Sequence, residues 1–283
     1  MTRICVTAGN ADEIRKFREA GADEIVLAPE GCAMSALPEF STEEIAGQGT
    51  VSLLMNRLFM PEMLVKAEAV LDTVRAEQID SVYFSDPAMV PIAEKRGLKD
   101  RLIYKPEMLA VSTFDAEWWM AQGIASVSVS PLLTRDEIMN ILKKVPGLQI
   151  TVHGRLLMSV SARPLLSAYR EDTGTVFDEH SRHLFLKEEK REEKMPVFET
   201  ESGTYIYSDF IQESFDDVKL FASAGAGSFF IDSAGSDPEL IADAVRTLRA
   251  VMNESDSGKA VQDYRRKYAG VLSEGYYGQK TIR

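Results

Sequence analysis

Residues 228–252 read SFFIDSAGSDPELIADAVRTLRAVM, and the fold can be predicted outward from this stretch. Residues 228–232 form a short apolar run, which is typical of a buried strand. Residues 238–252 then carry apolar side chains at helical spacing, which predicts a strong amphipathic helix. The stretch therefore predicts one strand followed by one helix.

The same alternation of a short apolar run and a helical stretch recurs along the chain. Strands are predicted over residues 4–7, 24–28, 51–56, 81–85, 102–105, 126–130, 148–153 and 228–232. Helices are predicted over residues 11–20, 61–77, 115–122, from Thr134 onward, and 238–252. Eight such alternations predict a parallel sheet with helical crossovers, and eight strands suffice to close it into a barrel with a filled interior. We therefore expect an α/β fold of the (β/α)8 TIM-barrel-like class. An open doubly wound sheet is the alternative, although no G-x-G-x-x-G follows the first strand.

One segment departs from the alternation of strand and helix. Residues 154–227 separate the seventh and eighth predicted strands, and this segment is far longer than an ordinary crossover. Short strands are predicted within it at residues 183–188, 197–199 and 204–208, with the charged run 187–194 as a solvated turn or helix end. We expect a barrel-like domain over residues 1–252, including an insertion and crossover at 155–225. Residues 253–283 would then be a C-terminal extension.

The composition argues against several classes of protein. The chain has 283 residues, 45% of them hydrophobic and 27% charged, with a formal net charge of −12. Such acidity argues against autonomous binding of nucleic acid, although a local basic patch or a basic partner remains open. Two cysteines, Cys5 and Cys32, cannot supply four thiolates and are predicted to be buried free thiols. We expect no signal peptide, no membrane span and therefore a cytoplasmic protein.

Polar residues that end the barrel strands are the best functional candidates, because that rim forms the active site in (β/α)8 enzymes. The residues at this rim are Asn56, Arg57, Asp86, Lys105, Glu107, Ser130, His153, Arg155 and Asp232. The catalytic candidates are His153, Asp86 and Asp232, although Asp86 and Asp232 fit helix capping equally well. Arg57 suits an anionic ligand or a salt bridge to an acidic neighbour.

A metal site is not expected. His180 and His183 lie three residues apart, but no third ligand is evident. His153 as a lone histidine at a strand end is more often structural than catalytic. G-x-S-x-G and H-E-x-x-H are both absent, so the usual serine hydrolase and zinc peptidase signatures are missing.

Residues 152–167 read VHGRLLMSVSARPLLS and resemble a segment of the collagenase-like peptidase family U32, which reads V-H-G-x-L-C-x-x-x-S-G-R-C-L-L-S. The positions that match this pattern are Val152, His153, Gly154, Leu156, Ser161, Arg163, Leu165, Leu166 and Ser167. Weaker blocks in the same order are Asn56–Leu58, Asp86–Pro87, Gly203–Ile206, Gly225–Asp232, Gly275–Tyr277 and Lys280–Ile282. The resemblance thus spans nearly the whole chain.

The two cysteines of the family segment are replaced here by Leu157 and Pro164, and no cysteine follows downstream. The resemblance implies iron–sulfur clusters in well-understood members, and such clusters need four thiolates. We therefore expect no cluster and no other cofactor on this chain. It resembles the short, cysteine-poor branch similar to the tRNA hydroxylation protein P subgroup, which is paired with a longer, cysteine-bearing paralogue.

The resemblance implies a role in forming 5-hydroxyuridine at the wobble position of tRNA, with prephenate implicated as the source of the hydroxyl group. A prephenate-like anion would then bind Asn56, Arg57, Arg155, Ser161 and Arg163, with His153 orienting it. A collagenase-like peptidase is a second hypothesis. A binding or scaffold subunit without chemistry is a third, so whether the chain is an enzyme is left open, as is contact with tRNA through a complex.

Overall fold

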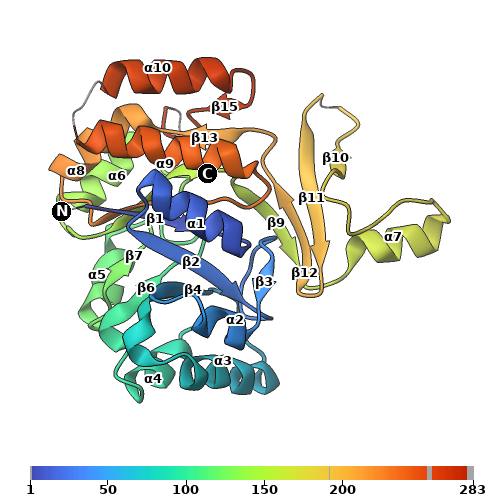
Figure 1. Cartoon of the computed structure of the whole chain (residues 1–283), viewed down its shortest axis with the longest axis horizontal. Helices are drawn as coiled ribbons and strands as arrows, with labels where there is room; N and C mark the ends of the chain where they lie inside the picture. Colours follow the sequence, from blue (N-terminus) through green and yellow to red (C-terminus); the bar gives the residue numbers. More distant parts are fainter. Residues whose placement is uncertain (1, 191, 254–256, 279–283) are drawn as a thin grey trace.

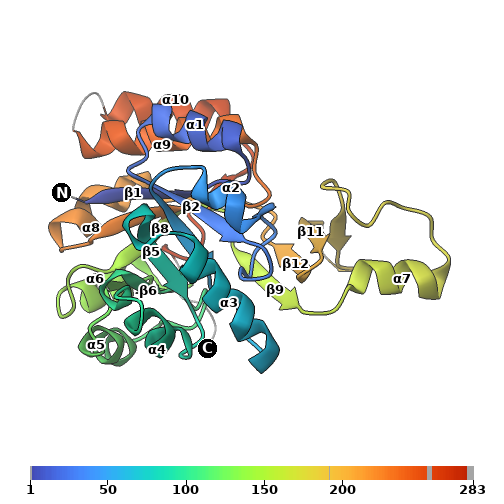
Figure 2. The same cartoon turned by 60° about the horizontal axis from the view of Figure 1, so that its bottom comes forward.

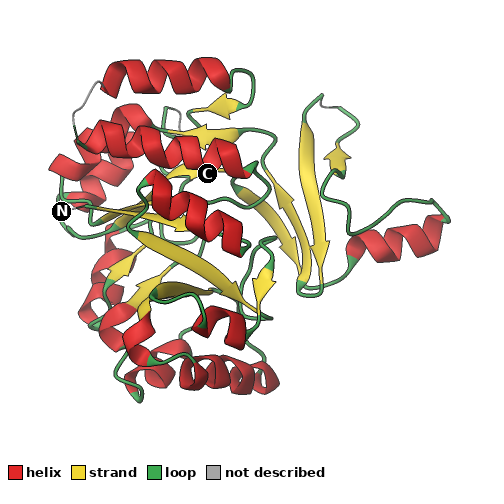
Figure 3. Cartoon of the chain, in the orientation of Figure 1, coloured by secondary structure: helices red, strands yellow, loops and turns green. Residues whose placement is uncertain are grey.

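The computed structural model describes residues 2–190, 192–253 and 257–278 as a mixed α/β protein, with strands at the centre and helices around them (Figure 3). The central parallel strands are β1 (Arg3–Thr7), β2 (Glu24–Pro29), β4 (Val51–Met55), β5 (Ile79–Phe84), β6 (Leu102–Tyr104), β7 (Ser126–Val127), β8 (Gln149–Gly154) and β14 (Ser228–Ile231). The further strands are β3 (Glu39–Phe40), β9 (Leu157–Ser161), β10 (Phe185–Lys187), β11 (Lys194–Thr200), β12 (Gly203–Tyr207), β13 (Ile211–Glu213) and β15 (Leu272–Ser273).

Ten α-helices are described, and most of them cover the outside of the parallel strands (Figures 1 and 3). They are α1 (Ala11–Ala20), α2 (Thr42–Ala46), α3 (Pro61–Thr73), α4 (Met89–Glu94), α5 (Thr113–Ala121), α6 (Arg135–Leu142), α7 (Leu165–Thr173), α8 (Val218–Ser223), α9 (Pro238–Met252) and α10 (Ser257–Lys267). Helix α6 begins as predicted after Thr134, with a capping box in which the side chains of Thr134 and Glu137 each bond the backbone of the other. Within the described residues, no helix combines the length and the apolar character that crossing a membrane requires.

The parallel strands form one curled sheet in the order β8-β14-β1-β2-β4-β5-β6-β7. The two ends of this row approach each other, because Ser128, just after β7, forms a parallel bridge with Gln149 of β8. In addition, the backbone N–H of Val129 donates to the carbonyl of Gln149 at 3.1 Å. The expected α/β fold built on a curled parallel sheet is thus confirmed. We call the opening at the C-terminal ends of these strands the mouth.

Apolar side chains pack on both faces of the curled sheet, as the alternation of strand residues requires. The larger cluster lies between the sheet and the helices and includes Phe17, Val245 and Ile231. The smaller one lies on the inner face and includes Cys5, Tyr83 and Phe230. Both cysteines are free and buried, as predicted.

Strands β9 to β12 form a separate four-stranded antiparallel sheet in the order β10-β11-β12-β9, which we call the insertion sheet. Figures 1 and 2 show it beside the mouth, with α7 projecting away from the curled sheet. The predicted strands at 183–188, 197–199 and 204–208 correspond to β10, β11 and β12. The charged run after β10 begins with an exposed turn at residues 189–190; residue 191 lies outside the described residues. Strand β9 and helix α7, formed by the segment that resembles the family pattern, were not predicted.

Residues 257–278 pack against the rest of the described chain. Helix α10 lies along α9, and β15 pairs in parallel with β13 (Figure 1). Tyr277 is buried, and its hydroxyl donates to the backbone carbonyl of Thr151 in β8. Residues 280–282, one of the weaker family blocks, lie outside the described residues.

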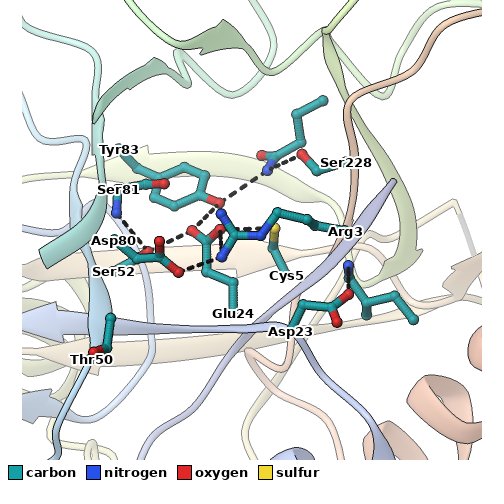
Figure 4. Close-up of polar contacts among 12 residues, drawn as sticks. Arg3, Cys5, Asp23, Glu24, Thr50, Ser52, Asp80, Ser81, Tyr83 and Ser228 are labelled. Atoms are coloured by element: carbon teal, nitrogen blue, oxygen red, sulfur yellow. Dashed lines mark hydrogen bonds and ion pairs between the residues drawn. The ribbon is translucent and has the colours of Figure 1, made fainter. Parts of the chain in front are cut away.

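A buried polar network closes the opposite end of the curled sheet from the mouth (Figure 4). Glu24 at the start of β2 accepts hydrogen bonds from Ser52 Oγ at 2.5 Å and Tyr83 Oη at 3.0 Å. Its other oxygen lies 3.3 Å from the Arg3 guanidinium and 3.4 Å from the Cys5 thiol. Arg3 also pairs with Asp80. Because several strands contribute to one carboxylate, this network ties their N-terminal ends together.

Candidate functional site

A lysine and a glutamate form an ion pair at the mouth, directly after β6. The Lys105 ammonium lies 3.1 Å from Glu107 Oε2, and its side chain is only 6% exposed. It also lies over the ring of Phe230, 4.6 Å from the centroid. Lysine is rarely buried this deeply unless it is paired or functional. The pair therefore marks this end of the sheet as a candidate site.

Asn56 at the end of β4 holds the glutamate of this pair. Its Nδ2 donates to Glu107 Oε1 at 2.6 Å, while its Oδ1 accepts from the backbone N–H of Met34 at 2.9 Å. Both ends of the amide are thus engaged, which fixes its orientation. Asn56 was predicted as a binding residue, and the structure places it in this cluster.

Glu107 has an unusual backbone. Its φ of 53° makes it the single non-glycine residue with positive φ in the part of the chain that the structure describes. A non-glycine residue in this region carries backbone strain, and such strain often occurs at functional sites. Held between Lys105 and Asn56, the carboxylate is therefore positioned at the cost of local backbone energy.

Asp232 follows β14 on the other side of the mouth. Its Oδ1 accepts hydrogen bonds from the backbone N–H of Ala234 at 2.9 Å and from Thr7 Oγ1 at 3.3 Å. Burial raises the pKa of Asp232, although the nearby Lys105 ammonium opposes the rise. Burial likewise raises the pKa of Glu107, against the effect of Lys105. Two acids that hold their protons more tightly than usual thus flank one lysine.

The insertion sheet covers this cluster. Leu157, Phe198 and Tyr207 of that sheet are buried against residues of the inner face. The Tyr207 hydroxyl accepts from the backbone N–H of Ala36 at 3.1 Å. Solvent still reaches the cluster, because the Glu107 side chain is 16% exposed. The cover therefore leaves only a small part of the Lys105–Glu107 pair accessible to solvent.

A separate cleft of about 570 Å³ lies between the loop after β2, the start of α3 and the turn after β11. Its charged lining residues are Glu30, Glu39, Arg57, Lys66 and Glu201. Glu39 is engaged by the backbone N–H of Gly31 and by Ser202 Oγ. Among the described residues, no ion pair or hydrogen bond engages the Arg57 guanidinium, so it can bind an anion.

His153 does not reach the mouth. Its Nε2 lies 2.6 Å from Tyr264 Oη of α10, and its ring stacks on Phe215 with centroids 5.8 Å apart. The reason is a bulge, because β8 pairs with β14 as Phe230 with Thr151 and then Ile231 with His153. The extra residue turns His153 to the same outer face as Ile231.

Burial lowers the pKa of His153 from 6.5 to about 3. The unfolded chain therefore binds a proton here below pH 6.5 that the folded chain does not bind until about pH 3. Stability should fall as the pH drops through this window, by about 2 kcal/mol between pH 7.5 and pH 5. Urea denaturation at both pH values should show this loss in the wild type and a loss smaller by about that amount in His153→Gln. His180→Gln, which changes an exposed histidine, should behave as the wild type. If His153→Gln lost as much stability as the wild type between these pH values, the lowered pKa of His153 would be contradicted.

Arg155 lies in the connection from β8 to β9 and bonds the connection from β12 to β13. Its guanidinium donates to the carbonyls of Ser208 and Asp209 at 2.8 Å and of Gly235 at 3.3 Å. Burial lowers its pKa. The structure thus uses Arg155 to fasten the insertion sheet to the loop after β14.

Two predicted binding residues lie on the insertion sheet. Ser161 Oγ ends β9 and accepts from the backbone N–H of Arg163 at 3.1 Å. Arg163 is exposed. Asp86, a catalytic candidate, accepts from the backbone N–H groups of Ala88 and Phe59, both at 2.9 Å, and so orders the turn before α4.

The structure therefore brings Asn56 and Asp232 together but does not gather Arg57, Arg155, Arg163 and His153 in one pocket. The bulge turns His153 to the outer face, Arg57 lines the separate cleft, Arg155 is bonded to backbone carbonyls, and Arg163 is exposed. Lys105 and Glu107, which lay on the predicted rim, were not chosen as site residues. Their signal was a lysine ending an apolar strand, followed by Pro106 and a second charge.

The described residues contain no group of three or more histidine, cysteine, aspartate or glutamate side chains arranged to hold a metal ion. His180 and His183 belong to no such group among those residues. Leu157 and Pro164 occupy the positions where the family pattern has thiolates.

The sequence matches the model of peptidase family U32 over residues 9–281. It is 24% identical to tRNA hydroxylation protein P2 of Bacillus subtilis over 263 residues, which cover 88% of this chain and 85% of that protein. It is 22% identical to tRNA hydroxylation protein P of Escherichia coli over 226 residues, which cover 64% of this chain and only 50% of that protein. A collagenase of Porphyromonas gingivalis is 20% identical over 304 residues, covering 97% of this chain and 72% of that protein.

Among solved structures, a U32 peptidase superposes with a TM-score of 0.52 at 18% identity, covering 84% of this chain and 95% of that chain. At this identity the superposition shows a shared fold alone.

Proposed function

The chain belongs to peptidase family U32, and on that basis we propose that it is a component of tRNA wobble-uridine hydroxylation, which forms 5-hydroxyuridine. The observation that carries the proposal is the match to tRNA hydroxylation protein P2, which extends over most of both chains. Relatives with this name support a role related to tRNA hydroxylation. The proposal assumes a (β/α)8-type barrel with its insertion between the seventh and eighth strands, and a cytoplasmic protein.

The chemistry that we assign to this chain is the binding of a small anion of the prephenate type. Arg57 is the principal ligand, because its guanidinium faces a cleft of sufficient volume and is free of ion pairs within the described residues. Lys66 adds a second cation, since its only described ion pair, with Glu30, is loose at 3.8 Å. A guanidinium recognises a carboxylate through two parallel hydrogen bonds, so Arg57 would fix the orientation of the ligand.

We further propose that a cysteine-bearing paralogue acts with this chain and supplies the thiolates that it lacks. An apolar groove on the insertion sheet supports a protein partner. Exposed groove residues include Leu165, Tyr169, Phe185 and Leu186. Exposed apolar patches of this kind commonly mark sites of protein association. Contact with tRNA would be made through the complex, because this chain is strongly acidic.

The test is the 5-hydroxyuridine content of tRNA, measured by mass spectrometry of nucleosides. Deleting the gene together with its paralogues should abolish 5-hydroxyuridine, and restoring the wild-type pair should return it. Arg57→Ala should reduce the recovered amount about tenfold, as expected for one lost charge-assisted hydrogen-bonded pair. Lys95→Ala removes an exposed cation just after α4, away from the cleft, and should restore the modification fully. Unchanged 5-hydroxyuridine after the combined deletion would overturn the proposal.

A further inference from the structure

The proposed function assigns no role to Lys105, the buried cation at the mouth. It lies on the inner face of the sheet, with its ammonium against Glu107 on one side and the ring of Phe230 on the other. Burying a lysine costs free energy, and an ion pair with a partly exposed partner offsets little of it. A leucine here would fill the same space without the penalty. The burial therefore favours a chemical role for the amine.

We infer that Lys105 forms an imine with the carbonyl group of a small 2-oxo acid. Three features lead to this: a largely buried primary amine, a carboxyl group 3.1 Å from it, and the partial exposure of that carboxyl side chain to solvent. Amines placed in this way act as nucleophiles toward carbonyl compounds. The inference goes beyond the proposed function, which assigns Lys105 no reaction.

Glu107 supplies the proton transfers that the reaction needs. It first takes a proton from the Lys105 ammonium, which leaves a neutral amine. The nitrogen lone pair then forms a bond to the carbonyl carbon, and the carbonyl oxygen takes the proton from Glu107. One proton of the nitrogen returns to Glu107.

Glu107 next protonates the hydroxyl of this carbinolamine, which departs as water while the nitrogen lone pair forms the C=N bond. The sum is an ammonium and a ketone giving an iminium and one water, with no oxidant or reductant required. The raised pKa of Glu107 makes its carboxylate a stronger base toward the Lys105 ammonium than an ordinary glutamate would be.

The surroundings select a carbonyl compound that also carries a carboxylate. Asn56 holds Glu107, and the next residue in the chain, Arg57, is a cation that lines the separate cleft. The raised pKa values of Glu107 and Asp232 reduce repulsion of an incoming anion. A 2-oxo acid offers a carbonyl group to Lys105, and its carboxylate meets little repulsion from these two acids.

The test is reductive trapping of the full chain with pyruvate and sodium borohydride, followed by peptide mass spectrometry. The expected result is a label on Lys105 that requires both reagents and exceeds the label on Lys66 at least about tenfold. Lys105→Arg keeps the charge and should abolish this label. Glu107→Gln keeps the hydrogen bond to Asn56 and should slow labelling of Lys105 about a hundredfold.

Absence of label on Lys105, or label no greater than on Lys66, would overturn the inference. An unchanged rate in Glu107→Gln would do so as well. Circular dichroism of each variant verifies that it is folded. Because trapping uses no tRNA, its failure leaves the proposed hydroxylation function standing, and failure of the tRNA experiment leaves the imine inference standing.

Discussion

Gly154→Ala should lower the free energy of unfolding by about 3 kcal/mol or more, from backbone strain and a severe overlap together. Gly154 has a φ of 133°, a conformation that L side chains rarely adopt. A Cβ there would lie 2.6 Å from the backbone oxygen and 2.9 Å from the Cβ of Asp232. Both contacts are with groups that cannot move freely, so β8 and β14 must separate. Urea denaturation measures the loss.

Gly49→Ala is the matched control for this change. Gly49 also has a positive φ, 79°, but nothing lies within 4 Å of a Cβ built on it. Only the conformational penalty applies, about 1 kcal/mol. Equal losses in the two variants would show that the approach of Asp232 to Gly154 is not tight. Because Asp232 lies at the mouth, Gly154→Ala should also reduce trapping at Lys105, whereas Gly49→Ala should not.

Glu24→Ala should cost about 2–4 kcal/mol of unfolding free energy, since it removes the shared acceptor of a buried network. The hydroxyls of Ser52 and Tyr83 would lose their acceptor, and Arg3 would lose one of its two acidic partners (Figure 4). Glu24 itself is only 3% exposed, so water does not replace these bonds easily. The midpoint of urea denaturation should therefore fall clearly.

Asp80→Ala provides the comparison, because Asp80 pairs with the same arginine but is 31% exposed. Ion pairs at exposed positions contribute about 0–1 kcal/mol, so this variant should stay close to the wild type. If Asp80→Ala cost as much as Glu24→Ala, the stability would come from the charge of Arg3 rather than from the buried network. Both variants leave the mouth intact and should trap pyruvate normally.

The positions of the central parallel strands were predictable, because local signals in the sequence agree with their place in the fold. Residues 228–232 and 238–252 correspond to β14 and α9, and the N-terminal strand to β1. Shorter elements of the insertion, such as β9, escaped prediction. Leu157–Ser161 owes its strand conformation to pairing with β12 rather than to apolar alternation, and two of its residues are exposed.

The location of the candidate site was predictable from the sequence, but the side chains that form it were not. Strand ends located the rim that contains Asn56, Lys105 and Asp232. One inserted residue in β8 then turned His153 outward, and no local signal marks that bulge. The left-handed backbone of Glu107 was equally invisible, since glutamate is no indicator of positive φ.

The sequence by itself determined the alternating strands and helices, the acidic charge, the loss of two thiolates at Leu157 and Pro164, and the resemblance to a family. These properties are carried by residue type and spacing along the chain. Tertiary structure decided which polar side chains meet, because register, bulges and the cover of the insertion sheet arise from pairing between distant segments. Lys105 and Glu107 form a site only because β4 and β14 bring Asn56 and Asp232 beside them and the insertion sheet limits the access of water.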